Sequence, residues 1–288
     1  MTERNGMRYG VLGLIVLTLL IFLGLMVAIQ SPTTSEPTAP GATTAPALES
    51  LAALDGQAPA RRALDIQTWT TAEGAKVLFV AAPQLPMFDL RLTFAAGSSQ
   101  DGDVPGLAML TNAMLNEGVA GKDVGAIAEG FEGLGAQFGN GAYRDMAIAS
   151  LRSLSQRDLR EPALALFTEV LGAPSFPADS LARIQNQLLA GFEYQKQNPG
   201  KLAGIALFEA LYGNHPYAHS SDGNAQSIPA ITLTQLRAFH AKAYTASNAV
   251  IAVVGDLSRS EAEAISAQVS AALPKGPALA KTPQPEVP

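Results

Sequence analysis

The stretch that decides the fold reads DLRLTFAAGSSQDGDVPGLAMLTNAMLNEG and spans residues 89–118. Its first six residues alternate polar and apolar side chains, which is typical of a strand with one buried face. A polar loop over 96–102 then leads to Pro105, a residue favoured in the first turn of a helix. Apolar residues recur at helical spacing over 107–115, and Gly118 lies just past that pattern. We therefore expect a strand, a loop and a helix in this order.

Other strands and helices are predicted on both sides of this stretch. Two short segments rich in strand-forming residues, at 68–70 and 77–80, flank a glycine-containing loop, which predicts a hairpin. Further strands are expected at 146–154 and 249–254. Apolar residues at helical spacing predict the remaining helices, over 122–135, 156–172, 181–195, 202–211, 233–244 and 259–273. Because the strands are grouped early and the helices mostly follow, the predicted fold class is α+β.

The composition excludes several classes of protein. The chain has 288 residues and is 48% hydrophobic, which counts against disorder over most of its length. Nineteen Lys and Arg against twenty-five Asp and Glu give a formal net charge of −6, so nucleic acid is not an expected partner. There is no cysteine, which excludes disulfides, thiolate zinc sites, iron–sulfur clusters and cysteine nucleophiles.

The N-terminal part is predicted to be a membrane anchor. Residues 9–29 carry no charge and would cross a hydrocarbon layer of about 30 Å as a helix. Arg4 and Arg8 precede this run, and the next basic residue is Arg61, so residues 1–8 are expected in the cytoplasm and the rest outside it. In a Gram-negative bacterium the outside would be the periplasm. A cleaved signal peptide is the alternative, but the apolar run is long for one and no clear A-x-A site follows it.

Two segments rich in proline border the expected globular part. Residues 30–60 combine prolines and threonines with no aromatic side chain, so they cannot bury enough apolar surface to fold and are predicted to form a disordered tether. The folded domain is expected over 61–273. Residues 274–288 are again rich in proline and are predicted to be a linker or a truncated end.

Several motifs along residues 65–275 together resemble the N-terminal half of the pitrilysin/insulinase/mitochondrial-processing-peptidase family of zinc peptidases. Each motif is short, and their order and spacing carry the resemblance. They are AGSSQD at 96–101, GLA at 106–108, LGA at 134–136, LYGNHPY at 211–217, LRAFH at 236–240, and NAVIAVVGDL at 248–257. The resemblance implies a mostly antiparallel or mixed sheet covered by helices.

The zinc-binding motif of that family is degenerate in this chain. Active members carry H-x-x-E-H, in which two histidines on one helix face bind zinc and the glutamate activates water. The corresponding positions here are Met109, Leu110, Thr111, Asn112 and Ala113. The family's third ligand, a glutamate, would fall at about Ala190 or Gly191, and the nearby Glu193 has a different helix angle. We therefore expect no metal, no cofactor and no catalytic residue at this site.

The resemblance, with these ligands absent, implies a non-catalytic subunit that pairs with an active zinc peptidase of the same family. In the family, the strand at 146–154 borders the substrate chamber, so Tyr143 and Arg144 are predicted to contact a bound peptide. An extended peptide would add to an exposed sheet edge through main-chain hydrogen bonds. A peptide-binding scaffold without a peptidase partner is an alternative.

A second alternative is a metal-dependent peptidase with a displaced site. His215 and His219 lie four residues apart and could bind metal with Asp222. Pro216 disfavours helical backbone at His215, so this arrangement is not expected. His240 is interpreted as a structural histidine. The glycines at 130, 133, 135, 139 and 141 are interpreted as a helix end and a turn, because no basic residue accompanies them as a phosphate site would need. No Gly-x-Ser-x-Gly motif is present, and the pair Ser98–Ser99 lies in a loop.

Overall fold

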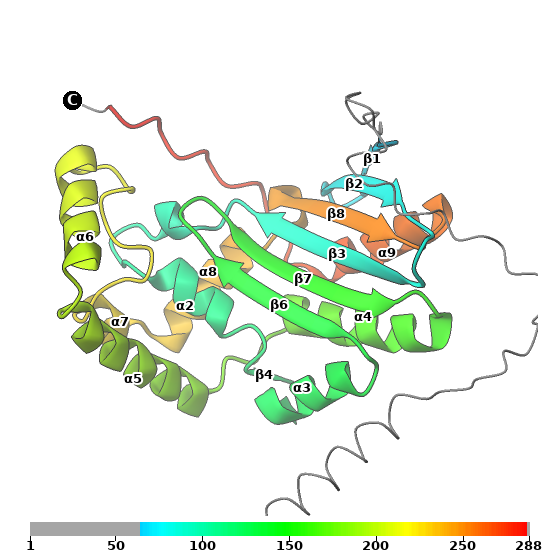
Figure 1. Ribbon diagram of the computed structural model, residues 1–288, viewed down its shortest axis with the longest axis horizontal. Helices are drawn as coiled ribbons and strands as arrows, with labels where there is room; N and C mark the ends of the chain where they lie inside the picture. Colours follow the sequence, from blue (N-terminus) through cyan, green and yellow to red (C-terminus); the bar gives the residue numbers. More distant parts are fainter. Residues whose placement is uncertain (1–63, 287–288) are drawn as a thin grey trace, which may run out of the picture. The chain divides into compact units, whose positions relative to one another are not determined.

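The computed structural model describes residues 64–286, and the predictions for residues 1–63, including the anchor at 9–29 and the tether at 30–60, lie outside this range. The described part is built on a six-stranded sheet with the order β1-β2-β8-β3-β7-β6 (Figure 1). All neighbouring strands run antiparallel except β2 and β8, which are parallel. The strands are β1 Gln67–Thr70, β2 Lys76–Ala81, β3 Met87–Phe94, β6 Gln137–Ala142, β7 Ala147–Leu154 and β8 Ala249–Gly255. The prediction of an α+β fold with a mixed sheet is confirmed.

The alternation seen in the sequence sets which side of β3 is buried. Phe88, Leu90, Leu92 and Phe94 are almost fully buried, whereas Asp89 and Arg91 between them are exposed. One face of this central strand therefore supplies the core and the other meets solvent. A small second sheet pairs β4 Gly118–Val119 with β5 Lys122–Asp123.

Helices pack on this core. Helix α4 contacts β7 and α9, and α9 also contacts β2. Helices α5, α6 and α7 lie together at the end of the domain away from β1 (Figure 1). The helices are α2 Leu107–Ala113, α3 Val124–Glu132, α4 Arg157–Gly172, α5 Ala178–Gln195, α6 Pro199–Tyr212, α7 Ser227–Ala230, α8 Leu233–Ala243 and α9 Arg259–Ala272, with 3₁₀ turns η2 Ser98–Gln100 and η3 Ala246–Asn248. No helix within residues 64–286 combines the length and the apolar character that a membrane crossing requires.

The glycine-rich stretch was only partly predicted correctly. Gly133 does end helix α3, and Gly135, with a φ of +63°, forms the following turn. Gly139 and Gly141, however, lie in strand β6, which pairs with β7 along its whole length. The interpretation of this part as a turn was wrong because pairing with β7 outweighs the low strand propensity of glycine. The helix predicted over 122–135 is also shorter, since Asp123 caps it by accepting the Ala126 N–H.

The segment after α9 contains no helix or strand up to residue 286, yet it is attached to the domain. We call residues 276–283 the C-terminal strap. Hydrogen bonds join it to three separate regions of the chain: the corner at 245–248, the loop at 99–100, and His215. A freely moving linker would not make this set of contacts.

Candidate functional site

Helix α2 carries the degenerate motif, and a buried carboxylate fixes its start. Asp101, whose side chain is fully buried, accepts the N–H groups of Gly106 at 2.8 Å and Ala108 at 2.7 Å. A negative charge at a helix N-terminus satisfies free N–H groups and interacts favourably with the helix dipole. His219 Nε2 lies 3.2 Å from the same carboxylate and 3.1 Å from the Ser98 carbonyl. The loop before α2 and the loop after α6 are thereby joined.

Asn112 occupies the position of the family's catalytic glutamate, and it is used to hold the fold together. Its side chain is 2% exposed, and its amide donates to the Ile148 carbonyl on β7 and to the Tyr244 hydroxyl, both at 3.1 Å. Burial raises the pKa of Tyr244 well above its ordinary value, so this hydroxyl stays protonated. The amide therefore fastens α2 to the sheet and to the end of α8.

The two histidine positions carry no group that zinc prefers. Met109 and Ala113 are half-buried and lie one turn apart on α2, next to β6. Asn140 of β6 donates to the Asn112 carbonyl at 2.7 Å and to Asn116 Oδ1 at 3.3 Å. A thioether and a methyl group supply no imidazole or carboxylate, so these residues do not fit a zinc ion. Within residues 64–286 no cluster of three or more potential ligands is present.

The expected position of the third zinc ligand also lacks a side chain that could bind zinc. Ala190 and Gly191 lie in α5 and are exposed. Glu193 pairs instead with Lys196 at 2.7 Å, and both side chains are more than half exposed.

Tyr143 and Arg144 lie in the turn between β6 and β7, and their surroundings differ. Arg144 Nη1 donates to the carbonyls of Tyr217 at 2.5 Å and His219 at 3.3 Å, and its guanidinium lies over the Phe208 ring. This arginine therefore has a structural role that its sequence position did not reveal. Tyr143 is 53% exposed and available to a ligand. Its predicted contact with a peptide stays a prediction.

The alternative metal site at His215 and His219 is not assembled. His215 Nδ1 accepts the Tyr217 N–H at 3.1 Å, so Nε2 carries the proton, which it donates to the Pro283 carbonyl at 2.9 Å. Both nitrogens of His215 are thus occupied by protein groups, and Nε2 of His219 faces Asp101 and Ser98. The structure does not bring the two rings to a common point with Asp222.

Two further interpretations concern side chains near this site. His240 is buried, as expected for a structural histidine, and its Nε2 lies 2.8 Å from the Leu171 carbonyl. The fold does place a histidine near the serine pair, but Ser98 Oγ donates to Ser221 Oγ and not to an imidazole. No serine–histidine pair of the kind used by hydrolases is formed there.

Strand β6 is an edge of the sheet, which the sequence did not predict. In the described range it pairs only with β7, so its other side presents main-chain N–H and C=O groups next to α2. The fold and the motif alignment together indicate a zinc-peptidase-like domain in which Met109 and Ala113 stand at the two histidine positions and Asn112 stands at the position of the general base.

Comparisons with known proteins agree with this class. The family model described as the peptidase M16 inactive domain matches residues 230–288. The crystal structure of a peptidase M16 inactive domain from Pseudomonas fluorescens is 79% identical, with a TM-score of 0.77 over 77% of this chain and 54% of that chain. A non-peptidase homolog, YmxG, of Helicobacter pylori is 30% identical over 60% of this chain and 40% of its own length. An uncharacterized zinc protease of Mycobacterium leprae is 24% identical over 72% of this chain and 46% of its own length.

The chain belongs to the peptidase M16 family, that is, the pitrilysin/insulinase family named by the sequence motifs. It spans about half the length of the relatives it matches. The family model, described as the inactive domain, matches residues 230–288 alone, so the assignment of residues 65–275 to the N-terminal half stays a prediction.

Proposed function

We propose that this chain is a membrane-anchored, catalytically silent subunit that pairs with an active zinc peptidase of its own family. The observation that carries the proposal is the chemistry of α2: the general-base position is an asparagine amide already bonded to Ile148 and Tyr244. A group held in this way cannot activate water, and no imidazole is present at Met109 or Ala113 to bind zinc.

The proposed role in holding a peptide does not depend on zinc. Strand β6 offers free main-chain groups beside α2, and an extended peptide can bind such an edge through main-chain hydrogen bonds alone. Tyr143, at the end of β6, is exposed and would contact that peptide. The silent subunit would thus hold part of a substrate that the active partner cleaves.

Anchoring completes the proposal. Residues 9–29 would place the chain in a membrane with residues 31–288 outside the cytoplasm, because the flanking arginines all lie on the N-terminal side. A reporter fused after Pro288 should be active only if it functions outside the cytoplasm. Activity of a strictly cytoplasmic reporter at this position would contradict the orientation.

The pairing is tested by purifying the full chain from its own cells in a mild detergent. We expect a second chain that carries an intact H-x-x-E-H motif, and peptide hydrolysis that requires this second chain and is lost on chelation. Recovery of the present chain alone, repeatedly and under mild conditions, would count against pairing.

A peptide-binding scaffold remains the second candidate, because the open edge of β6 needs no partner to bind a peptide. Peptide binding by the purified chain in the absence of any active chain would favour it. Stoichiometric zinc in the chain alone, with chelator-sensitive hydrolysis, would overturn both proposals.

A further inference from the structure

Helix α6 has the composition of a buried helix and the exposure of a surface helix. Its sequence, PGKLAGIALFEALY, contains only two charged residues, Lys201 and Glu209. None of its fourteen residues is buried, and the side chains of Leu202 and Leu207 are 45% and 59% exposed. A helix that is apolar on most sides normally lies inside a protein or against a partner, because exposed apolar surface is unfavourable in water.

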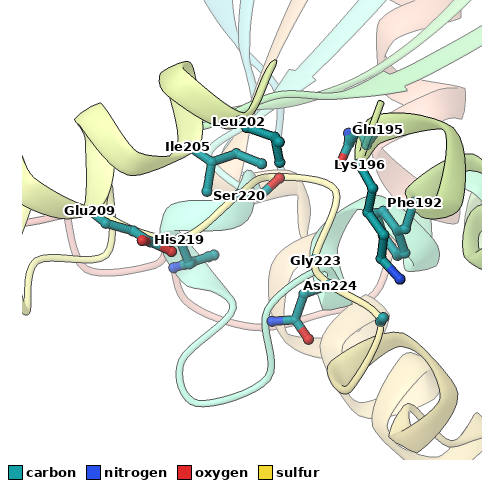
Figure 2. A pocket seen from close by; sticks show the side chains of 11 residues that line it. Phe192, Gln195, Lys196, Leu202, Ile205, Glu209, His219, Ser220, Gly223 and Asn224 are labelled. Carbon is teal, nitrogen blue, oxygen red and sulfur yellow. The ribbon is translucent and has the colours of Figure 1, made fainter. Parts of the chain in front are cut away.

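A groove runs beneath the same helix. Leu202 and Ile205 of α6 face the loop that carries Ser220 and Gly223, with Phe192 of α5 and Lys196, just after α5, on the far side (Figure 2). This hollow has a volume of about 220 Å³. A second hollow of about 270 Å³ adjoins it at Ile205 and is lined further by Arg144 and Phe208. The helix therefore stands off the domain on its inner side and is uncovered on its outer side.

The C-terminal strap indicates what covers this surface. Ser247 Oγ donates to the Gly276 carbonyl at 2.6 Å, Gln100 Nε2 donates to the Ala280 carbonyl at 3.1 Å, and Thr282 Oγ1 donates to Ser99 Oγ at 2.9 Å. A fourth hydrogen bond joins His215 to the Pro283 carbonyl. His215 follows the C-terminal end of α6 closely, and the strap runs toward that helix (Figure 1). The strap thus leads the chain to one end of the apolar helix.

In the Pseudomonas fluorescens relative the matched region makes up 54% of the chain, so a further region of similar size is present there. We infer that the surface formed by α6 and its groove is the docking site for a second M16-type domain. The inference rests on the proposed function, since it names the surface by which pairing occurs. A domain that follows a fixed strap is held near this surface at high effective concentration, and the same surface serves when the second domain is on another chain.

The charge of α6 argues against a membrane as the occupant. Helices that lie on anionic membranes carry many Lys and Arg residues on their polar face, whereas α6 carries a single lysine and a glutamate. An apolar centre with few charges is instead typical of protein–protein interfaces.

The test replaces Leu207 in the full chain by the photo-crosslinking residue p-benzoylphenylalanine, in the protein's own cells. The matched control places the same residue at Leu85, which is 62% exposed and lies between β2 and β3. Mass spectrometry of the products should find peptides of an M16-type domain joined to position 207 and not to position 85. Products joined to a second copy of this region, to lipid or to unrelated proteins, equal products at both positions, or no product would each overturn the inference.

A second measurement separates this inference from the proposed function. Leu207→Glu should reduce the co-purified partner at least tenfold, whereas Leu85→Glu should leave it unchanged. An H-x-x-E-H chain that co-purifies equally with Leu207→Glu would overturn the docking surface and leave the proposed pairing intact. An M16-type domain without H-x-x-E-H crosslinked at position 207 would support the surface and contradict the active partner.

Discussion

Helices α2 and α6 show two opposite uses of helical sequence in one domain. Five of the seven residues of α2 are buried, and the helix is fixed at its start by Asp101, which accepts backbone N–H groups, and near its end by Asn112, which donates to the Ile148 carbonyl. Helix α6 is twice as long and equally rich in apolar residues, yet none of its residues is buried. Helix α2, whose counterpart carries the zinc motif in active members of the family, has a structural role here, whereas the mainly apolar helix α6 is left uncovered. The absence of zinc-binding groups on α2 and the exposure of apolar side chains on α6 are therefore separate features of the domain.

The largest expected difference comes from the same truncation in the two helices. Leu110→Ala in α2 removes a fully buried side chain and should lower the free energy of unfolding by about 2–5 kcal/mol. Leu207→Ala in α6 removes an exposed one and should change it by no more than about 0.5 kcal/mol. Urea unfolding followed by the fluorescence of Trp69, the single tryptophan, measures both. Equal decreases in the free energy of unfolding for the two variants would contradict the difference in burial between α2 and α6.

The role of Asn112 is tested by a change of nearly constant shape. Asn112→Asp replaces the amide donor by an acceptor or a charge that faces the Ile148 carbonyl, so we expect a loss of about 3 kcal/mol in the free energy of unfolding. Asn116→Asp is the matched control, because Asn116 is only half-buried and its oxygen already accepts from Asn140. Similar stability of Asn112→Asp and the wild type would show that the amide does not hold α2.

The start of α2 should respond to loss of the buried carboxylate. Asp101→Asn removes the charge that accepts two backbone N–H groups and faces His219, at an expected cost of about 2 kcal/mol. Asp103→Asn, two residues along and exposed, should be close to neutral. The denaturant midpoints of the two variants measure this difference. An unchanged midpoint for Asp101→Asn would show that this carboxylate does not fix the start of the helix.

The smallest expected effect is a pH dependence next to Tyr244, the hydrogen-bond partner of Asn112. Burial lowers the pKa of His240, while its bond to the Leu171 carbonyl partly opposes this. As the pH falls, His240 is protonated in the unfolded chain before it is protonated in the folded one. The free energy of unfolding should therefore be constant above about pH 6.5 and decrease below it, by at most about 1.4 kcal/mol per pH unit. His240→Gln should reduce that slope between about pH 6.5 and 5. Parallel curves for variant and wild type would contradict the assignment.

Much of the fold follows from local sequence patterns, and most of the site does not. The alternation in β3 and the helical spacing in α4, α5 and α9 predict those elements, because a single buried face dictates the pattern. Strand β6 was missed because Gly139 and Gly141 have low strand propensity, even though their partners Ser150 and Ile148 lie on β7, the next strand along the chain.

Several side-chain contacts of the site join residues far apart in the sequence, so local patterns do not reveal them. The loss of zinc ligands at Met109 and Ala113 is visible in the sequence, because it needs only the residue types. The use of Asn112 depends on Tyr244, which lies 132 positions away, and the structural role of Arg144 depends on Tyr217 and His219. A polar residue inside an apolar helical stripe, as at Asn112, is the one signal that could have marked a buried hydrogen bond.

The open edge of β6 has a consequence for the chain when it is alone. A sheet edge that accepts a peptide through main-chain hydrogen bonds offers the same bonds to the edge of another copy, which is a common start of aggregation. Gly139 and Gly141 remove side chains that would add cross-strand contacts, so each added strand is held weakly and can leave again. If a peptide binds along β6, the two glycines would limit how tightly it is held, and by the same physics they would weaken pairing between the β6 edges of two copies.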